Sequence, residues 1–424
     1  MSKIHHQLKL SSRFSDGIMF LSGMLATLII SWCFPSIILS NSNPVSSLNP
    51  SLITPFLSTK TKTVNQTTFY DDPNMNYTMG APVQNWDEKR QQWLAANPSF
   101  AGSRERVLMV TGTQPKPCTN PDGDHFLLRL FKNKVDYCRI HGHDIFYNNV
   151  LLHPGMFGYW AKYPLVKAAM LAHPEAEWIW WVDSDAVFTD MDFALPLEKY
   201  KNYNLVAYGW PSVIYKKKSS MGVNAGVFLI RNCQWSMEMI DRWASFGPQT
   251  ENYAKWGKIQ EKMFYDKTDT TSDDQTALTY MLLVEKDQWA DKIHLESEYY
   301  FQGYWLDIVE KYENVTSHYT EIEKKVPELR MKHAEKAGEK YRALWQKYLA
   351  GANAGGYTDG SWRRPFMTHF TGCEPCSGKF NPMYTAEACT GGLVRALNFA
   401  DSQVLRNFGY TRRDLSNSSS VEYL

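Results

Sequence analysis

Two carboxylates, Asp183 and Asp185, are the strongest candidates for chemistry in this 424-residue chain. They are separated by Ser184 and directly follow the apolar run Trp-Ile-Trp-Trp-Val at 178–182. In extended backbone, residues i and i+2 point to the same side, so both carboxylates can face one point just past the end of a strand. Two negative charges at one point repel unless a cation lies between them, and a hard divalent ion that also takes phosphate oxygens suits that place. We therefore interpret the triplet as a metal site.

The acidic triplet has two other interpretations. A solvated acidic turn would need no ion, and a glycosidase carboxylate pair would need neither a metal nor, usually, a phosphate partner. The apolar strand that leads straight into the triplet favours the metal site, because ligands of open α/β sheets bind at the carboxyl ends of strands. His369, in the segment Thr-His-Phe-Thr-Gly-Cys at 368–373, is a candidate third ligand, although a lone histidine is more often structural.

A second acidic pair, Asp273 and Asp274, precedes Gln275 and the apolar stretch 276–283. The stretch predicts a buried helix, and Ser272 or Asp273 can cap its N-terminus, where the helix dipole favours negative charge. A capping residue can also face a cleft, where a carboxylate would stabilise a sugar carbon that becomes positive during transfer. Both interpretations stay open from the residues alone.

Small residues lead into an apolar strand at 221–230. Gly222 and Gly226 would allow the backbone to approach a ligand closely. Asn224, between them, could form hydrogen bonds to sugar hydroxyls. The alternative is the ordinary start of a strand.

Hydrophobic periodicity predicts alternating strands and helices in the first half of the folded body. Strands are predicted at 107–110, 145–147 and 178–182, and helices at 124–141 and 162–173. In the first helix, the apolar stripe is expected to run through Leu127, Phe131, Val135 and Cys138, which recur at spacings of four and three. This alternation predicts a parallel α/β sheet. The turn after the first strand contains Gly112 and Thr113. The charged segment 319–350 predicts a peripheral helical elaboration rather than a second catalytic domain.

The N-terminus predicts a membrane anchor. Residues 17–40 carry no charge. This stretch is long enough to span a bilayer core, which needs roughly 20 apolar residues. Positive charges precede this stretch and none follows until Lys60, so residues 1–16 are expected in the cytosol and the rest in the lumen. A cleaved signal peptide is the alternative, which Pro35 leaves open.

The next segment, 41–103, is rich in Ser, Thr, Asn and Pro and predicts an exposed lumenal stem. Asn65 and Asn76 lie in glycosylation triplets within it, and Asn314 lies in another farther on. The catalytic domain is expected at 104–415, followed by a short tail at 416–424.

Six cysteines lie beyond the predicted anchor, and an even number in the lumen permits disulfides whose pairing the sequence does not fix. Cys373 and Cys376 are more consistent with disulfides than with half a zinc site. Net charge is +1, with no basic block, so a nucleic-acid partner is not expected.

In combination, these motifs resemble the plant family of Golgi xyloglucan α-1,6-xylosyltransferases and galactomannan α-1,6-galactosyltransferases. The resemblance covers about residues 104–415. It is carried by the segments 180–191, 224–226, 272–275, 299–305 and 368–373.

The resemblance implies a GT-A fold, a Rossmann-like nucleotide-sugar-binding architecture, with a UDP-sugar donor, Mn²⁺ and retention of anomeric configuration. It implies that Asp183, Asp185 and His369 hold the ion. Catalytic roles at the sugar carbon fall to Asp273 and Asp274, with Gln275 helping to position substrate. Further substrate contacts are implied for Gly112, Thr113, Lys162, Ser184, Asn224, Gly226, Gln302, Trp305 and Gly372.

Segments 140–149 and 173–182 and the charged insertion look more like the galactomannan branch. The xylosyltransferases have a Lys where this chain has Glu374, and a His where it has Gln302. Loss of that Lys puts a phosphate contact from this loop in doubt, and Lys379 or Lys162 could compensate.

We therefore expect a Golgi type II membrane enzyme that adds α-1,6-galactose from UDP-galactose to a β-1,4-mannan backbone. Xylosyl transfer to a β-glucan is the alternative within the same class. A non-catalytic lumenal scaffold for partner transferases is the alternative from another class. Association with other polysaccharide synthases, or with a second copy of the chain, is left open by the sequence, as is the oligomeric state.

Overall fold

The computed structural model describes residues 71–100, 105–329, 338–351 and 361–424. The predicted cytosolic tail, anchor and Asn65 lie outside these residues. Within them, no helix is both long enough and apolar enough to cross a membrane.

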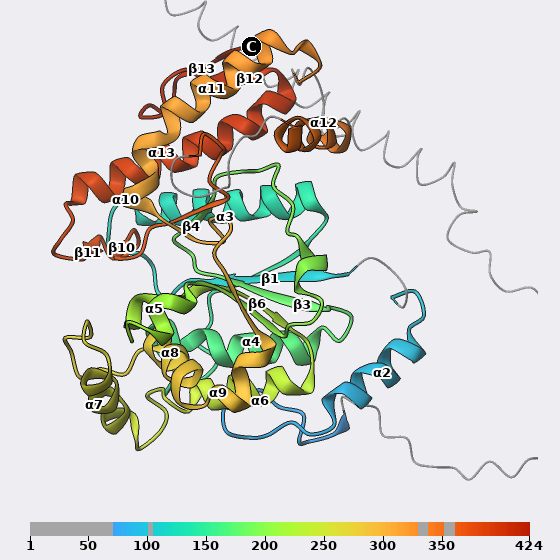
Figure 1. Cartoon of the computed structure of the whole chain (residues 1–424), viewed down its shortest axis with the longest axis vertical. Helices are drawn as coiled ribbons and strands as arrows, with labels where there is room; N and C mark the ends of the chain where they lie inside the picture. The colour runs from blue at the N-terminus through green and yellow to red at the C-terminus, as the bar shows by residue number, and fades with distance from the viewer. Residues whose placement is uncertain (1–70, 101–104, 330–337, 352–360) are drawn as a thin grey trace, which may run out of the picture. The chain divides into compact units, whose positions relative to one another are not determined.

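A six-stranded sheet forms the centre of the molecule (Figure 1). Its order is β2 (Asp144–Asn148), β1 (Val107–Gly112), β3 (Trp178–Val182), β6 (Val223–Arg231), β5 (Leu205–Gly209) and β7 (Ile293–Glu296). The pairs β1–β2, β1–β3 and β5–β7 are parallel, whereas β6 is antiparallel to both β3 and β5. The prediction of a parallel sheet is therefore corrected to a mixed sheet. A strand covered on both faces is apolar whichever way it runs, so its pattern does not encode direction.

Helices cover both faces of the sheet, and successive strand residues pack into two different cores. In β3, Trp178, Trp180 and Val182 pack on the side of α3 (Gly123–His141). Ile179 and Trp181 pack on the opposite side. That side is covered by α4 (Lys162–Ala172), α6 (Gln234–Ala244) and α8 (Asp274–Val284) (Figure 1).

The buried face of α3 differs from the predicted one. The expected stripe ran through Leu127, Phe131, Val135 and Cys138, but the first three are only half-buried. The helix instead buries Phe126, Leu130 and Tyr137 together with the polar Asn133 and Lys134. Because Asn133 and Lys134 are polar, the buried side of the helix carries no continuous apolar stripe. The stripe read from the sequence therefore lies one position away from the residues that are buried.

A second sheet of three short strands lies beside the end of β3. Its order is β4 (Ala186–Phe188), β9 (Met367–His369) and β8 (Gly303–Tyr304). The β4–β9 pairing places His369 opposite Ala186, directly after the acidic triplet. This pairing brings two parts of the chain together that are far apart in sequence.

The C-terminal half adds a helical layer over α3 (Figure 1). It contains α10 (Trp305–Ile308), α11 (Tyr312–Lys325), α12 (Gly338–Gly351) and α13 (Ala386–Leu405). The segment 319–350, predicted as a helical elaboration, falls in α11 and α12, and the helical layer begins before it, at Trp305. Helix α11 ends before Pro327, because a residue preceding proline is disfavoured in helical conformation.

Residues of the predicted stem pack on the folded body. Trp86, in α2 (Trp86–Ala96), is fully buried, and its Nε1 donates to Asn232 Oδ1 at 2.7 Å. Lys167, also fully buried, donates from Nζ to the backbone oxygens of Thr78 (3.1 Å) and Ala81 (2.8 Å). The folded unit therefore begins before the predicted boundary at 103/104.

Asn76 is half-buried and its Oδ1 accepts from the backbone N of Thr78, whereas Asn314 is exposed on α11. Glycosylation at either residue stays a prediction. The remaining elements are short and peripheral. They are α5 (Pro211–Tyr215), α7 (Tyr253–Met263), α9 (Lys286–Trp289), β10 (Cys373–Glu374), β11 (Lys379–Phe380), β12 (Tyr410–Arg412) and β13 (Val421–Tyr423).

Two disulfides join Cys118 to Cys376 and Cys373 to Cys389. The neighbouring Cys373 and Cys376 thus use disulfides, as expected, but with different partners. Among the described residues, Cys138 and Cys233 are free thiols.

Candidate active site

The three predicted metal ligands lie together at the carboxyl end of β3. Potential ligand atoms of Asp183, Asp185 and His369 all lie within 4.8 Å of one another. Nε2 of His369 is 3.1 Å from Oδ1 of Asp185 and 3.8 Å from Oδ2 of Asp183. The acids follow β3 and the histidine ends β9, so two sheets build one site.

Gly226 forms the floor of this cluster. A Cβ atom at this position would lie 2.4 Å from Cε1 of His369 and 2.6 Å from Oδ2 of Asp183. The backbone oxygen of Gly226 also accepts from the backbone N of Asp183 at 2.8 Å. The close approach predicted for this glycine is therefore made by the ligand side chains themselves.

The electrostatics of the cluster favour a cation. Burial lowers the pKa of His369, but the Asp185 and Asp183 carboxylates outweigh it, so the net shift is upward. Burial raises the pKa of Asp185, but His369 outweighs it and the net shift is downward. The two carboxylates thus favour a positive charge at this point, and a divalent ion can supply it in place of an imidazole proton. A donor set of two carboxylates and one imidazole fits such an ion.

Lys162 links this cluster to the second acidic pair. Its buried Nζ lies 2.9 Å from Oδ2 of Asp274 and 3.5 Å from Oδ1 of Asp183, and it donates to the backbone oxygen of Ala225 at 2.9 Å. Tyr163 Oη donates to the same oxygen of Asp274 at 3.2 Å. Burial raises the pKa of Asp274 to about 6 against the opposing effect of Lys162. Lys162 therefore connects Asp274 to the predicted metal ligand Asp183 through a single side chain.

Asp273 has a different environment. Its Oδ1 accepts from the backbone N of Thr276 at 2.7 Å, which makes it the N-cap of α8. Its Oδ2 accepts from Lys267 Nζ and from Thr276 Oγ1, each at 2.7 Å. Ser272, the other capping candidate, is fully buried, and its Oγ accepts from Gln260 Nε2. The structure therefore separates the pair into a cap, Asp273, and a buried carboxylate, Asp274.

Two amides continue the site on the side of β6. Asn224 Nδ2 donates to Gln275 Oε1 at 3.4 Å, and Asn224 Oδ1 accepts from the backbone N of Gly226 at 2.9 Å. Both side chains are only half-buried. They remain accessible for the substrate contacts predicted for them.

Gln302 and Trp305 lie behind the metal ligands. Gln302 is 8% exposed, and its Oε1 accepts from Nδ1 of His369 at 3.0 Å. Trp305 is 3% exposed and stacks on Phe370, with ring centroids 5.5 Å apart. The structure gives both residues a supporting position, and direct substrate contact stays a prediction.

Of the other predicted substrate residues, Gly112 ends β1, and Thr113, Ser184 and Gly372 lie on loops that follow strands. A Cβ atom at Gly112 would lie 2.4 Å from the backbone oxygen of Asn148, and Thr113 Oγ1 accepts from Tyr147 Oη at 3.0 Å. Gly372 has a φ of +81°, which favours glycine. Ser184 is half-buried. Substrate contact by these residues also stays a prediction.

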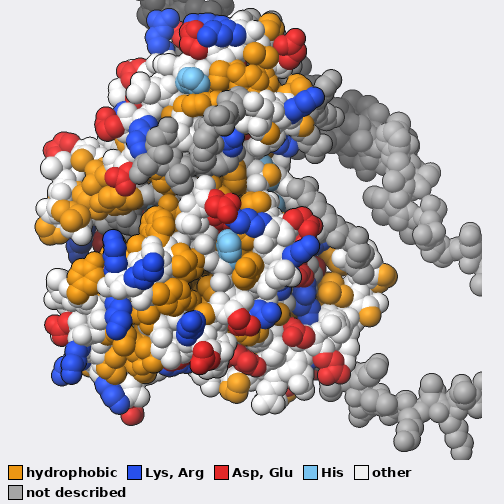
Figure 2. Space-filling model, in the orientation of Figure 1, with side chains coloured by type: hydrophobic (Ala, Val, Ile, Leu, Met, Phe, Trp, Pro, Cys, Tyr) orange, Lys and Arg blue, Asp and Glu red, His pale blue; other side chains and the backbone are white. Residues whose placement is uncertain are grey.

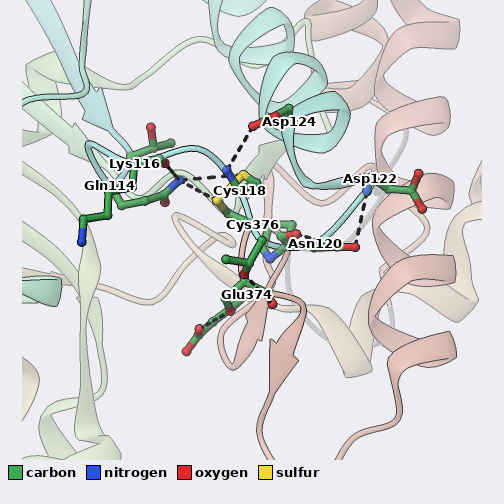
Figure 3. Close-up of a disulfide and its surroundings, with 12 residues drawn as sticks. Gln114, Lys116, Cys118, Asn120, Asp122, Asp124, Glu374 and Cys376 are labelled. Carbon is green, nitrogen blue, oxygen red and sulfur yellow. Dashed lines mark hydrogen bonds between the residues drawn. A yellow bond between two sulfur atoms is a disulfide. The ribbon is translucent and has the colours of Figure 1, made fainter.

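The hairpin β10–β11 follows Gly372 and is held to the segment after β1. The Cys118–Cys376 disulfide joins them, and Asn120 Nδ2 donates to the backbone oxygen of Pro375 at 2.8 Å (Figure 3). Glu374 and Lys379 face each other across the hairpin, and both are exposed. Lys379 therefore lies beside an acid, and its role toward phosphate stays a prediction.

Three residues that contact the site were missed in the sequence. Lys134 is 1% exposed and donates to the backbone oxygens of Ser184 (2.9 Å) and Ala186 (2.7 Å). Trp181 Nε1 donates to Oδ1 of Asp183 at 2.6 Å. The third is Tyr163, which donates to Asp274. A lysine on the apolar side of a predicted helix is a detectable signal, whereas nothing in the sequence distinguishes Trp181 or Tyr163 from core aromatics.

Comparison with known proteins gives a consistent pattern. A family model described as "galactosyl transferase GMA12/MNN10 family" matches residues 103–379. The chain is 53% identical to galactomannan galactosyltransferase 1 of Cyamopsis tetragonoloba, over 99% of this chain and 98% of that one. It is 43% identical to xyloglucan 6-xylosyltransferase 2 of Arabidopsis thaliana, over 81% of this chain and 68% of that one.

Likeness to solved structures is weaker. A glycosyltransferase involved in glycosylation of the major capsid of PBCV-1 matches with a TM-score of 0.34 and 10% identity, over 63% of this chain and 94% of that one. That likeness is too low to inform the fold or the site.

Proposed function

Because the chain belongs to the galactosyl transferase GMA12/MNN10 family, we propose that it transfers α-galactose from UDP-galactose to the O6 position of a β-1,4-mannan backbone. Identity to the Cyamopsis galactosyltransferase extends over nearly the full length of both chains, which favours this donor and acceptor over the xylosyl alternative. The reaction retains anomeric configuration. The α/β body is of GT-A type and acts in the Golgi lumen behind an anchor at residues 17–40.

The observation that carries the proposal is the position of Lys162, which contacts both Asp274 and Asp183. It places a buried carboxylate, Asp274, beside the cluster of Asp183, Asp185 and His369. A transferase that uses a nucleotide-sugar needs these two features together. One centre must take the charge of the leaving diphosphate, and a second group must stabilise positive character on the sugar carbon.

Asp183, Asp185 and His369 would hold Mn²⁺. A bound Mn²⁺ ion would neutralise the negative charge of the diphosphate. Lys162 holds Asp274 against the cluster and adds a second positive charge on the same side. Asp274 presents an anionic oxygen to the sugar carbon as the bond to UDP lengthens. Asn224 and Gln275 orient sugar hydroxyls.

The surface near the site suits an anionic donor. Figure 2 shows Lys and Arg side chains gathered along the edge of the molecule that carries α5 and α7. Lys216, Lys217 and Lys218, between α5 and β6, are exposed there. A positive edge raises the local concentration of a negatively charged ligand.

A donor and acceptor panel tests the proposal. Purified protein is incubated with UDP-galactose or UDP-xylose and with manno- or gluco-oligosaccharides, in Mn²⁺, and products are analysed by mass and linkage. We expect galactose on mannan oligosaccharides. Xylose on gluco-oligosaccharides would establish the alternative, and no transfer with any pair would favour a scaffold.

A further inference from the structure

We propose that Lys134 and Gln302 are positioning residues that hold the three metal ligands in binding geometry. Neither side chain belongs to the ligand cluster, and each contacts a different part of it from behind. This inference rests on the metal site of the proposed function.

Lys134 fixes the backbone on both sides of Asp185. It reaches from α3 and donates to the carbonyl oxygens of Ser184 and Ala186, the residues that flank that ligand. A buried ammonium is costly unless it is fully partnered. Here two of its hydrogen-bond partners are carbonyls of the turn itself, so the charge is satisfied only when the turn keeps this shape. Lys134 therefore selects the conformation in which both carboxylates converge.

The charge of Lys134 also acts on the ligands. The ammonium is 1% exposed, so its field on Asp183 and Asp185 is little screened by water. It offsets the mutual repulsion of the two carboxylates before a cation arrives. Because it donates to carbonyl oxygens rather than to the carboxylates, it leaves the carboxylate oxygens available for the ion.

Gln302 fixes which nitrogen of His369 faces the cluster. An amide oxygen only accepts, so Nδ1 of His369 must carry the proton that is donated to Gln302 Oε1. Nε2 is then the nitrogen that points to Asp185 and Asp183. Histidines that bind metals commonly donate their other N–H in this way, which sets both tautomer and ring orientation. Gln302 directly precedes β8, which pairs with β9, so the contact is built into the second sheet.

Four substitutions test the inference. Lys134→Met keeps the length and removes the ammonium. Lys132→Met is its matched control on the same helix, because the Lys132 side chain is 54% exposed and pairs with Asp136 and Asp401 instead. Gln302→Leu removes the acceptor, whereas Gln302→Glu keeps an acceptor oxygen and should rescue.

Calorimetric titration with Mn²⁺, alone and with UDP, gives the affinity of each variant, and circular dichroism gives its fold. We expect Lys134→Met and Gln302→Leu to bind Mn²⁺ about 10–100-fold more weakly than the wild type. Lys132→Met and Gln302→Glu should stay close to the wild type. Transfer by the two weakened variants should recover partly at high Mn²⁺, which a merely structural defect would not allow.

Folded Lys134→Met and Gln302→Leu proteins with wild-type Mn²⁺ affinity would overturn the inference. Should Lys134→Met fail to fold, the Gln302 pair decides, and equal affinity of Gln302→Leu and Gln302→Glu would overturn it. A wild-type protein that binds no Mn²⁺ with UDP present would instead remove the proposed metal site, and this inference with it.

Discussion

At the scale of single residues, Asp273 and Asp274 are adjacent in sequence but have different structural environments and different roles. Asp273 closes the N-terminus of α8 and pairs with Lys267, while Asp274 is buried against Lys162 and Tyr163. A local pattern of two acids before a helix cannot separate these roles. The separation comes from Tyr163, 111 positions upstream of Asp274, and from its neighbour Lys162, which only the folded chain brings near.

We expect Asp274→Asn to lower turnover on the order of 100-fold or more while leaving UDP affinity nearly unchanged, because the lost charge acts mainly in the transition state. Asp273→Asn keeps a capping oxygen and should cost at most about 1 kcal/mol of stability with little effect on turnover. Turnover, UDP binding and melting temperature are measured for both. A slow Asp273→Asn beside a normal Asp274→Asn would reverse the assignment.

The raised pKa of Asp274 predicts a pH dependence. Burial holds it at about 6, and the ionised form is the active one, so turnover should fall as pH drops through about 6. Protonation of His369 would also weaken activity in acid, but that effect should move to lower pH as Mn²⁺ is raised. The fall in turnover that comes from Asp274, which forms the acid limb of the pH profile, should not respond to the metal concentration in this way. An acid limb that disappears entirely at high Mn²⁺ would argue against Asp274.

At the scale of elements, the site depends on two sheets meeting at β3. The sequence predicts the positions of β1, β2 and β3 to within two residues, because each is an apolar run bounded by turn residues. It does not predict that β6 runs antiparallel or that β9 pairs with β4. Strand direction and long-range pairing are set by tertiary packing, and a three-residue strand such as Met367–His369 has too few residues to show a period.

Gly226 tests this arrangement of elements. Gly226→Ala should abolish Mn²⁺-dependent transfer while the protein stays folded, because the added methyl group would occupy the space of His369 and Asp183. Gly391→Ala is the control, since a Cβ atom there meets nothing within 4 Å and the position lies in α13. That change should leave transfer intact and add up to about 1 kcal/mol of stability. Normal transfer by Gly226→Ala would mean that the metal ligands do not pack on β6.

At the scale of the whole molecule, the boundary of the folded body lies inside the predicted stem. Ser, Thr, Asn and Pro dominate that segment, and composition alone indicates exposure. Three buried side chains, Met79, Val83 and Trp86, nevertheless join the core on the side of α4 and α6. Isolated apolar residues in a polar segment do not produce a periodic signal, which is why the sequence places the boundary too late.

A truncation series tests the boundary. Protein starting at residue 71 should fold and be active, whereas protein starting at residue 104 should be unstable, because it loses the buried Trp86, its hydrogen bond to Asn232 and the two backbone oxygens that accept from Lys167. In the longer version, Trp86→Ala should lower the free energy of unfolding by roughly 3–5 kcal/mol. Chemical denaturation measures both. Equal stability of the two truncations would show that residues 71–103 contribute nothing to the fold.

The proposed activity depends on one centre where a divalent ion and a nucleotide-sugar meet. The most direct measurement is the initial rate of galactose transfer to a manno-oligosaccharide as a function of Mn²⁺, for the wild type and for Asp185→Ala. Asp185 is half-buried at the end of a strand, so the substitution should leave the fold intact. We predict wild-type transfer that requires Mn²⁺ and is abolished by chelation, and no transfer by Asp185→Ala in limiting Mn²⁺. Near wild-type turnover by folded Asp185→Ala under those conditions would contradict the account.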